Sequence, residues 1–306
     1  MRDYIFIRKV CTSKWLVLLV FPILLACGDD DEPEVIVPVT RDYSVLTTQT
    51  ENAVGATWNE GDSLTVYTLA STSRFCYSLA GNSGSTTGTF NCQPSTETIE
   101  NGADCYALTA TYNIYGVSAT EGRHMKLSYQ LPAEYEVRQL SSGSGSYLMN
   151  VPSWGRLSFD DNGRPSTTLK PLTAFLAVDL STVPEGTRSI LITTHNSIRL
   201  NGADVAGGAG EPLAGIFDCI LEDGAALATS SLFMYKDIIR IVLDEDGDDN
   251  SWQALGRLYV PIVVGNYQRL QVVALAEQYY FDYEWKGTLL ATFDNQQFAL
   301  NSVNHK

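Results

Sequence analysis

The sequence predicts an all-β protein, and three observations support this fold class. Short runs in which apolar and polar residues alternate, such as residues 63–67 and 127–131, recur through the chain. Gly, Ser, Asn and Pro separate these runs about every 8–15 residues, which is typical of β-sandwiches. No window of helical length keeps an apolar stripe with a 3.6-residue period, so we expect little helix.

The first 26 residues are interpreted as a bacterial lipoprotein signal peptide. A basic start precedes an apolar stretch, residues 15–26, that is too short to span a bilayer. Ala26 places a small residue before Cys27, which matches the pattern in which the cysteine is acylated, with palmitate expected, and becomes the new N-terminus. The alternative is an ordinary secretory peptide with an incidental cysteine. The chain is therefore expected to be exported and anchored by lipid.

The acidic run at residues 28–32 resembles the export signal of surface-displayed lipoproteins. A solvated linker is the alternative interpretation, and the two are compatible. Together with Cys27, the run predicts a protein anchored by lipid in the outer membrane of the cell and facing outward. Beyond the signal, no apolar run approaches the length of a membrane helix.

The mature chain is strongly acidic. Removing residues 1–26 takes away four of the 20 basic residues and one of the 35 acidic residues, which leaves 16 against 34 and a formal charge of −18. Binding to phosphates needs clustered cations, so nucleic acid is excluded as a partner. The remaining 280 or so residues suffice for two cores of ordinary size.

Strands are expected in order along the chain. The apolar–polar alternation predicts strands at 63–67, 106–112, 127–131, 175–180, 190–192 and 238–243. Residues 257–264 and 270–275 are the most apolar and are predicted to be central strands. A break at residues 160–166, rich in Asp, Asn and Gly, falls near the middle of the mature chain. We therefore predict a tether at 27–40, an N-terminal β-sandwich at 41–165 and a C-terminal β-sandwich at 166–306.

Four cysteines remain after Cys11 leaves with the signal and Cys27 carries lipid. Cys76 and Cys92 lie symmetrically about Gly84, so a hairpin turning there would place them opposite each other. A disulfide between them and two free thiols are both consistent with this pattern. The state of Cys105 and Cys219 is left open.

No motif for enzymatic chemistry, a metal or a cofactor emerges from the sequence. No CxxC pair occurs, and His124 and His195 are interpreted as surface or loop histidines. The acidic run 244–250 departs from the EF-hand pattern at its sixth and twelfth positions, so a solvated turn is favoured over a calcium loop. We expect that the protein is not an enzyme and needs neither metal nor cofactor.

Several motifs, in a shared order, resemble the fimbrillin family, which comprises subunits of type V pili and related surface lipoproteins. The segments that carry the resemblance are 58–67 (WNEGDSLTVY), 106–112 (YALTATY), Leu131-Pro132 followed by Tyr147-Leu148-Met149, 172–178 (LTAFLAV), and 258–261 (LYVP) with 267–272 (YQRLQV). Each motif is weak alone. Their order extends across nearly the whole mature chain, behind a lipoprotein signal.

The resemblance implies two tandem transthyretin-like β-sandwich domains and a surface subunit of a fimbrium. It also implies polymerisation with other pilus subunits by strand donation, in which a strand of one subunit fills an open groove of the next. Such contacts are heterologous and generate filaments. Adhesion to host or bacterial surface ligands would suit a subunit at the tip.

Proteolytic maturation in the family implies a cut after an arginine in an early loop, and Arg41 is the best-placed candidate. The alternative is an ordinary surface arginine. Only 14 residues separate Cys27 from Arg41, so a retained lipid anchor, as in an anchor or accessory subunit, is equally consistent. Residues 293–303 are either a donor strand or the last strand of their own domain, and we favour the last strand.

A second hypothesis from another class is a glycan-binding surface lipoprotein that does not polymerise. The aromatic cluster at residues 279–285 would then stack on sugar rings. This hypothesis requires an exposed aromatic platform built from residues such as Tyr280 or Trp285.

Overall fold

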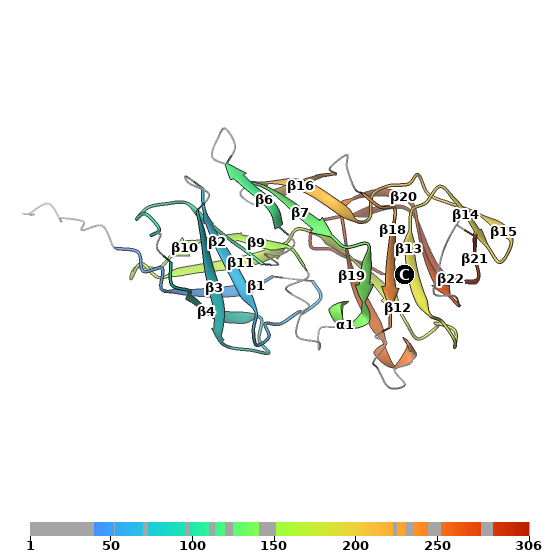
Figure 1. The fold of residues 1–306 in the computed structure, drawn as a ribbon, viewed down its shortest axis with the longest axis horizontal. Coiled ribbons are helices and arrows are strands. Elements are labelled where there is room, and N and C mark those ends of the chain that lie inside the picture. Colours follow the sequence, from blue (N-terminus) through green and yellow to red (C-terminus); the bar gives the residue numbers. More distant parts are fainter. Residues whose placement is uncertain are drawn as a thin grey trace, which may run out of the picture. The chain divides into compact units, whose positions relative to one another are not determined.

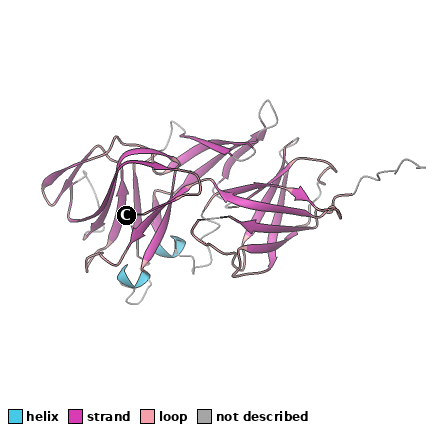
Figure 2. Cartoon of the chain, turned by 180° about the vertical axis from the view of Figure 1, so that it is seen from behind, coloured by secondary structure: helices cyan, strands magenta, loops and turns pink. Residues whose placement is uncertain are grey.

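The computed structural model describes residues 40–51, 53–69, 73–95, 98–109, 114–119, 125–140, 151–222, 225–230, 235–243, 252–276 and 284–305. Within them, the secondary structure is almost entirely strand, as Figure 2 shows. The helical elements are α1 (Val137–Leu140) and a 3-10 helix (Trp252–Leu255), each of four residues. The all-β prediction is confirmed.

The strands fall into five sheets. In chain order they are β1 (Val45–Thr50), β2 (Ser63–Thr68), β3 (Arg74–Gly81), β4 (Thr87–Cys92), β5 (Cys105–Leu108), β6 (Ile114–Ala119), β7 (Met125–Leu131), β8 (Glu134–Glu136), β9 (Ser153–Arg156), β10 (Ser158–Phe159), β11 (Pro165–Pro171), β12 (Ala174–Asp179), β13 (Ser189–Thr193), β14 (Ser197–Leu200), β15 (Ala203–Ala206), β16 (Gly215–Glu222), β17 (Ala225–Ser230), β18 (Ile238–Val242), β19 (Arg257–Ile262), β20 (Gly265–Leu275), β21 (Glu284–Trp285), β22 (Gly287–Phe298) and β23 (Val303–Asn304).

The largest sheet closes on itself. Its order is β1-β4-β3-β2-β5-β9-β11-β10, and β1 also pairs with β11 (Figure 1). That last pairing is parallel and matches Thr47 with Ser166 and Thr50 with Leu169. On its other side β1 pairs with β4 in the antiparallel sense. Strand β1 therefore has partners at both of its edges, and the ring encloses its own core.

The side chains inside this ring are large and aromatic. Trp58, Tyr77 and Phe90 are fully buried, and the Trp58 and Phe90 rings meet edge to face with centroids 4.9 Å apart. Gly88, on β4, leaves the space that the Trp58 indole fills, because a Cβ at this position would lie 2.9 Å from two indole atoms. Alternation along β1 places Leu46 in the same core and Thr47 in solvent.

A second set of sheets surrounds β13. The five-stranded sheet β22-β20-β13-β18-β8 packs through Ile190 and Ile192 into a core shared with β12 and β19 of the sheet β19-β12-β23. Leu191, between those two isoleucines, enters a separate core with Ile198 and Trp285 of the sheet β15-β14-β21. Successive side chains of a strand point to opposite faces, so β13 is apolar throughout because each of its faces meets a different sheet.

Strand pairing crosses the predicted domain boundary in both directions. From the first half, β7 pairs with β16 in the four-stranded sheet β17-β16-β7-β6, and β8 pairs with β18. From the second half, β11 belongs to the closed sheet. A single division at residues 165–166 therefore does not describe how the strands are shared, and the two sandwiches stay a prediction.

The predictions for the two most apolar strands have different outcomes. β20 lies between β22 and β13, so its interior place is confirmed. β19 lies at an edge of its three-stranded sheet, so the prediction of a central strand there was wrong. Its apolar side chains are buried in the core nevertheless, because apolar content reports the burial of the faces of a strand and not its place in the order of a sheet.

We predict that Gly88→Ala destabilises the ring by about 1–3 kcal/mol, because the new methyl group displaces the Trp58 indole. The matched control is Gly81→Ala on the neighbouring strand, where a Cβ meets nothing within 4 Å. Urea denaturation monitored by tryptophan fluorescence measures both variants. Equal stability of the two variants would contradict the packing that we describe.

A buried aspartate predicts a specific dependence of stability on pH. Burial raises the pKa of Asp62 to about 6, although the backbone N–H of Asn59 donates to its carboxylate at 2.8 Å. The folded state therefore holds this proton more tightly than the unfolded chain, in which the pKa is about 3.9. The resulting stabilisation is present below about pH 4 and is lost as the pH rises through about 6. Relative to Asp62→Asn, the unsubstituted protein should lose about 3 kcal/mol across this range, measured by denaturation at each pH. A constant difference between the two proteins would contradict the prediction.

Candidate functional site

The edge of β12 is open over half of its length. β19 pairs with every residue of β12 from Ala174 to Asp179. On the opposite edge, β23 pairs only with Phe175 and Leu176. In the part of the chain that the structure describes, no strand pairs with that edge at residues 177–179. Unpaired backbone N–H and C=O groups on such an edge are a template for a further strand.

The edge of β22 is also open. It pairs with β20 on one side, and the described residues place no strand on the other. The register shifts opposite Val272 and Val273, so Leu290 is the extra residue of a bulge. Along its twelve residues, β22 carries one charged side chain, Asp294, which accepts a hydrogen bond from Arg269 at 2.6 Å. Apart from the bulge, this edge has few of the features that block strand pairing.

A mainly apolar groove lies between these two strands. Its lining residues are Ala177, Val178, Asp179 and Thr182 from β12 and the residues after it, Val272 from β20, and Leu290, Ala291 and Phe293 from β22. The cavity is about 260 Å³, slightly below the roughly 300–1,000 Å³ of small-molecule pockets. An apolar groove beside unpaired backbone suits an added strand, because the backbone provides hydrogen bonds and the groove receives side chains.

The candidate processing residue, Arg41, is held against the closed sheet. Its Cζ lies 4.0 Å from the centre of the Phe159 ring, and its Nη1 donates to the carbonyl of Ala103 at 3.0 Å. The next residue, Asp42, donates its backbone N–H to the carbonyl of Gly163 at 2.9 Å. Proteases cut exposed, mobile segments most readily. The bond after Arg41 is therefore protected until this segment detaches.

A cut after Arg41 would also leave β1 in place. β1 starts at Val45 and is held by β4 and β11. The next basic residue in the sequence is Arg74, which already lies in β3. Because no Lys or Arg lies between Arg41 and Arg74, a protease specific for basic residues cannot cut between β1 and β3.

The hairpin expected around Gly84 forms, but Cys76 and Cys92 are free thiols. The residue opposite Cys92 is Tyr77, because the hairpin pairs Gly81 with Thr89 and β3 contains a bulge between Leu79 and Gly81. Cys76 therefore points to the face opposite that of Cys92, and the proposed disulfide is incompatible with this register. Burial raises the pKa of the Cys105 and Cys219 thiols to about 11 and about 12. These two are protonated at neutral pH and poorly reactive.

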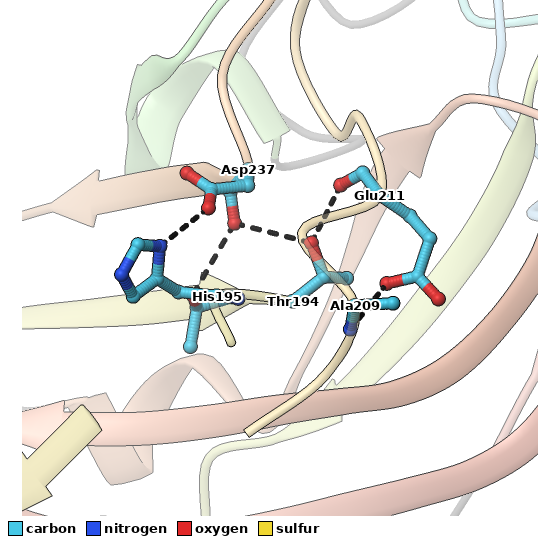
Figure 3. A network of polar contacts seen from close by, with 6 residues as sticks. Thr194, His195, Ala209, Glu211 and Asp237 are labelled. Atoms are coloured by element: carbon cyan, nitrogen blue, oxygen red, sulfur yellow. Dashed lines mark hydrogen bonds and ion pairs between the residues drawn. The ribbon is translucent and has the colours of Figure 1, made fainter. Parts of the chain in front are cut away.

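His195 is part of a polar network at the end of β13 (Figure 3). Its Nδ1 lies 2.6 Å from Oδ2 of Asp237, and both side chains are about one-fifth exposed. The Thr194 hydroxyl donates to the carbonyl of Glu211 at 2.5 Å, and the Thr193 hydroxyl to the carbonyl of Asp237 at 3.2 Å. Both hydroxyls therefore donate to backbone carbonyls. The network connects three loops. The interpretation of His195 as a loop histidine is confirmed, whereas its partner Asp237 was not predicted from the sequence.

Several predicted features lie outside the described residues. They are the signal peptide and Cys27, the tether up to residue 39, His124, the acidic run 244–250 and Tyr280. Trp285 is described and is buried, with 2% of its surface exposed. Within the described residues there is no helix long and apolar enough to cross a membrane, and no group of three or more His, Cys, Asp or Glu side chains placed to hold a metal.

Comparison with known proteins gives matches among solved structures. No family model and no curated protein matches the chain. A fimbrial protein from Bacteroides ovatus is 11% identical with a TM-score of 0.37, over 87% of this chain and 47% of that one, so the chain spans about half of its length. The tip fimbrial protein Mfa3 from Porphyromonas gingivalis, with a C-terminal truncation, is 9% identical with a TM-score of 0.32, over 76% and 77%.

Both of these solved structures are fimbrial proteins. Both TM-scores lie below 0.5.

We predict that trypsin cleaves the folded protein slowly after Arg41 and that Phe159→Ala accelerates this cut, because the ring under the guanidinium is removed. Mass spectrometry of a digestion time course measures the rate. Cleavage after Lys286, an exposed lysine between β21 and β22, is the internal control and should change little. Equal acceleration at both bonds would indicate general unfolding and contradict the prediction.

Proposed function

We propose that this chain is a surface-anchored, fimbrillin-like lipoprotein, a structural or accessory subunit of a pilus that assembles by strand donation. The observation that carries the proposal is the open edge of β12 beside the apolar groove, with the open edge of β22 on the far side. A donated strand would gain backbone hydrogen bonds and bury apolar side chains at once. The lipoprotein signal and Cys27 support a lipid anchor in the outer membrane.

Strand donation explains how such subunits form a filament. The donating segment and the accepting groove are different surfaces of one chain, so every copy that accepts a strand still has one to offer. Heterologous contacts of this kind do not close and propagate in one direction. Adhesion at the pilus tip and processing at Arg41 belong to the same proposal. The contacts of Arg41 with Phe159 and Ala103 imply that processing requires its segment to open first.

We also propose a non-enzymatic role with two sandwich modules, at residues 41–165 and 166–306, that exchange strands across their junction. The threonine hydroxyls next to the His195–Asp237 pair bind backbone carbonyls, which supports a structural use of that pair. The glycan-binding alternative loses one of its platform residues, because Trp285 is buried.

A pair of leucines on β22 tests the groove. Leu290 lines it, whereas the adjacent Leu289 is exposed and does not. In the mature chain carrying Cys27→Ser, Leu290→Asp should weaken self-association at least about tenfold, because a carboxylate would be buried against the incoming strand. Leu289→Asp is the matched control and should associate normally. Sedimentation velocity measures association, and a melting curve checks that each variant is folded.

If Leu290→Asp prevents folding, Ala291→Arg, at the next groove position, replaces it. Negative-stain images of cells carrying the same alleles should show surface filaments lost with Leu290→Asp and kept with Leu289→Asp. Normal filaments and normal association with a folded groove variant would overturn the proposal.

A further inference from the structure

The length of the open edge limits what the groove accepts. Three residues of β12, 177–179, lack a strand partner on that side. The incoming segment therefore needs only about three consecutive residues that can pair, with apolar side chains for the groove. Long donor strands would extend past the edge into solvent.

We propose that the occupant is the segment 34–37 of a second copy of this chain. Its sequence is Glu34-Val35-Ile36-Val37, bracketed by Pro33 and Pro38. Proline lacks the N–H needed for a sheet ladder, so pairing stops at both ends, and the usable strand of four residues is close in length to the open edge of three. β-branched residues favour strands and suit the apolar lining. This inference rests on the proposed function, because it names the donor for the same groove. It applies to the lipid-anchored chain that is not cut after Arg41, because that cut would remove residues 34–37.

The reach of the chain shows why the occupant belongs to another copy. Two residues separate Val37 from Thr40, so these two residues lie at most about 11 Å apart. Thr40 touches Gly163, where a Cβ would collide with the Thr40 carbonyl oxygen. Strand β11 starts two residues after Gly163 and runs about 23 Å before β12 begins.

The course of β1 leads to the same conclusion. β1 runs away from Thr40, and Glu51, directly after its last residue, accepts a hydrogen bond from the Asn301 side chain at 3.0 Å. Asn301 lies in the turn that leads into β23, the partner of β12. The groove thus lies at the end of β1 far from Thr40, beyond the reach of the same copy's residues 34–37.

The charges around the donor predict how association depends on salt. Glu34 follows the acidic run 29–32, and Asp179 lies at the groove. Each mature copy also carries a formal charge of −18, as counted above. Added salt screens this repulsion, so association should strengthen as ionic strength rises.

Cysteine cross-linking between two populations tests the inference. Both are mature chains with Cys27→Ser and Cys76→Ser, which removes the exposed thiol. One population carries Ile36→Cys and the other Ala291→Cys, at the groove. Because each chain has one of the two new thiols, a disulfide between positions 36 and 291 forms only between copies. The matched acceptor control is Thr47→Cys, exposed on β1.

We expect the 36–291 disulfide on mild oxidation, identified by mass spectrometry, and its loss when a peptide of residues 33–39 is added in excess. The same peptide with Ile36→Asp should not compete. Equal cross-linking of Ile36→Cys to Thr47→Cys would indicate random collision and overturn the inference. So would a 36–291 disulfide within monomers of a chain that carries both substitutions.

The test distinguishes failure of the donor inference from failure of the proposed function. If copies associate and Leu290→Asp prevents association, but no 36–291 disulfide forms, another strand fills the groove. The inference is then wrong and the proposed function stands. If the copies do not associate at any salt concentration, and folded Leu290→Asp protein behaves as the unsubstituted chain does, the proposed function fails as well.

Discussion

The constraint that organises this molecule is that the backbone groups along every strand edge need hydrogen-bond partners. Two of the sheets satisfy this requirement to different extents. The large sheet closes on itself, because the parallel pairing of β1 with β11 completes the ring. The smaller sheet containing β12 stays incomplete, because β23 covers only two residues of its edge. The large sheet is therefore closed, and the smaller sheet retains a position for a further strand.

This difference separates the candidate processing residue, Arg41, from the apolar residues just before it in the sequence, which we propose as the donor. The segment around Arg41 is attached to the closed sheet through contacts with Phe159, Ala103 and Gly163. Because β1 remains paired on both sides, a cut after Arg41 would not open the ring. The apolar residues before Arg41 are too close to Thr40 to reach the open edge of their own copy. Because the tether is short, residues 34–37 can pair only with the groove of another copy.

Much of the fold was predictable because alternation of apolar and polar residues is a local property. It located β2, β7, β12 and β20 within a few residues. β1 escaped prediction because its sequence, VLTTQT, carries threonines on its buried face as well as its wet face. The expected pairing of Cys76 with Cys92 failed because the hairpin turns one residue later than Gly84. Gly81 pairs with Thr89, and the bulge in β3 then places Tyr77, not Cys76, opposite Cys92. The partners of His195 and Arg41 lie more than 40 residues away in sequence.

The sequence by itself determined the fold class and the acidic character of the chain, and it predicted a lipoprotein signal, because composition, period and short motifs are properties of the sequence itself. The closure of the ring, the free thiols, the strands shared across the middle of the chain and the groove beside β12 were decided only by the tertiary structure. Each of these depends on which distant strands meet and in which register. That choice minimises the unpaired backbone and exposed apolar surface of the whole molecule, and no single segment encodes it.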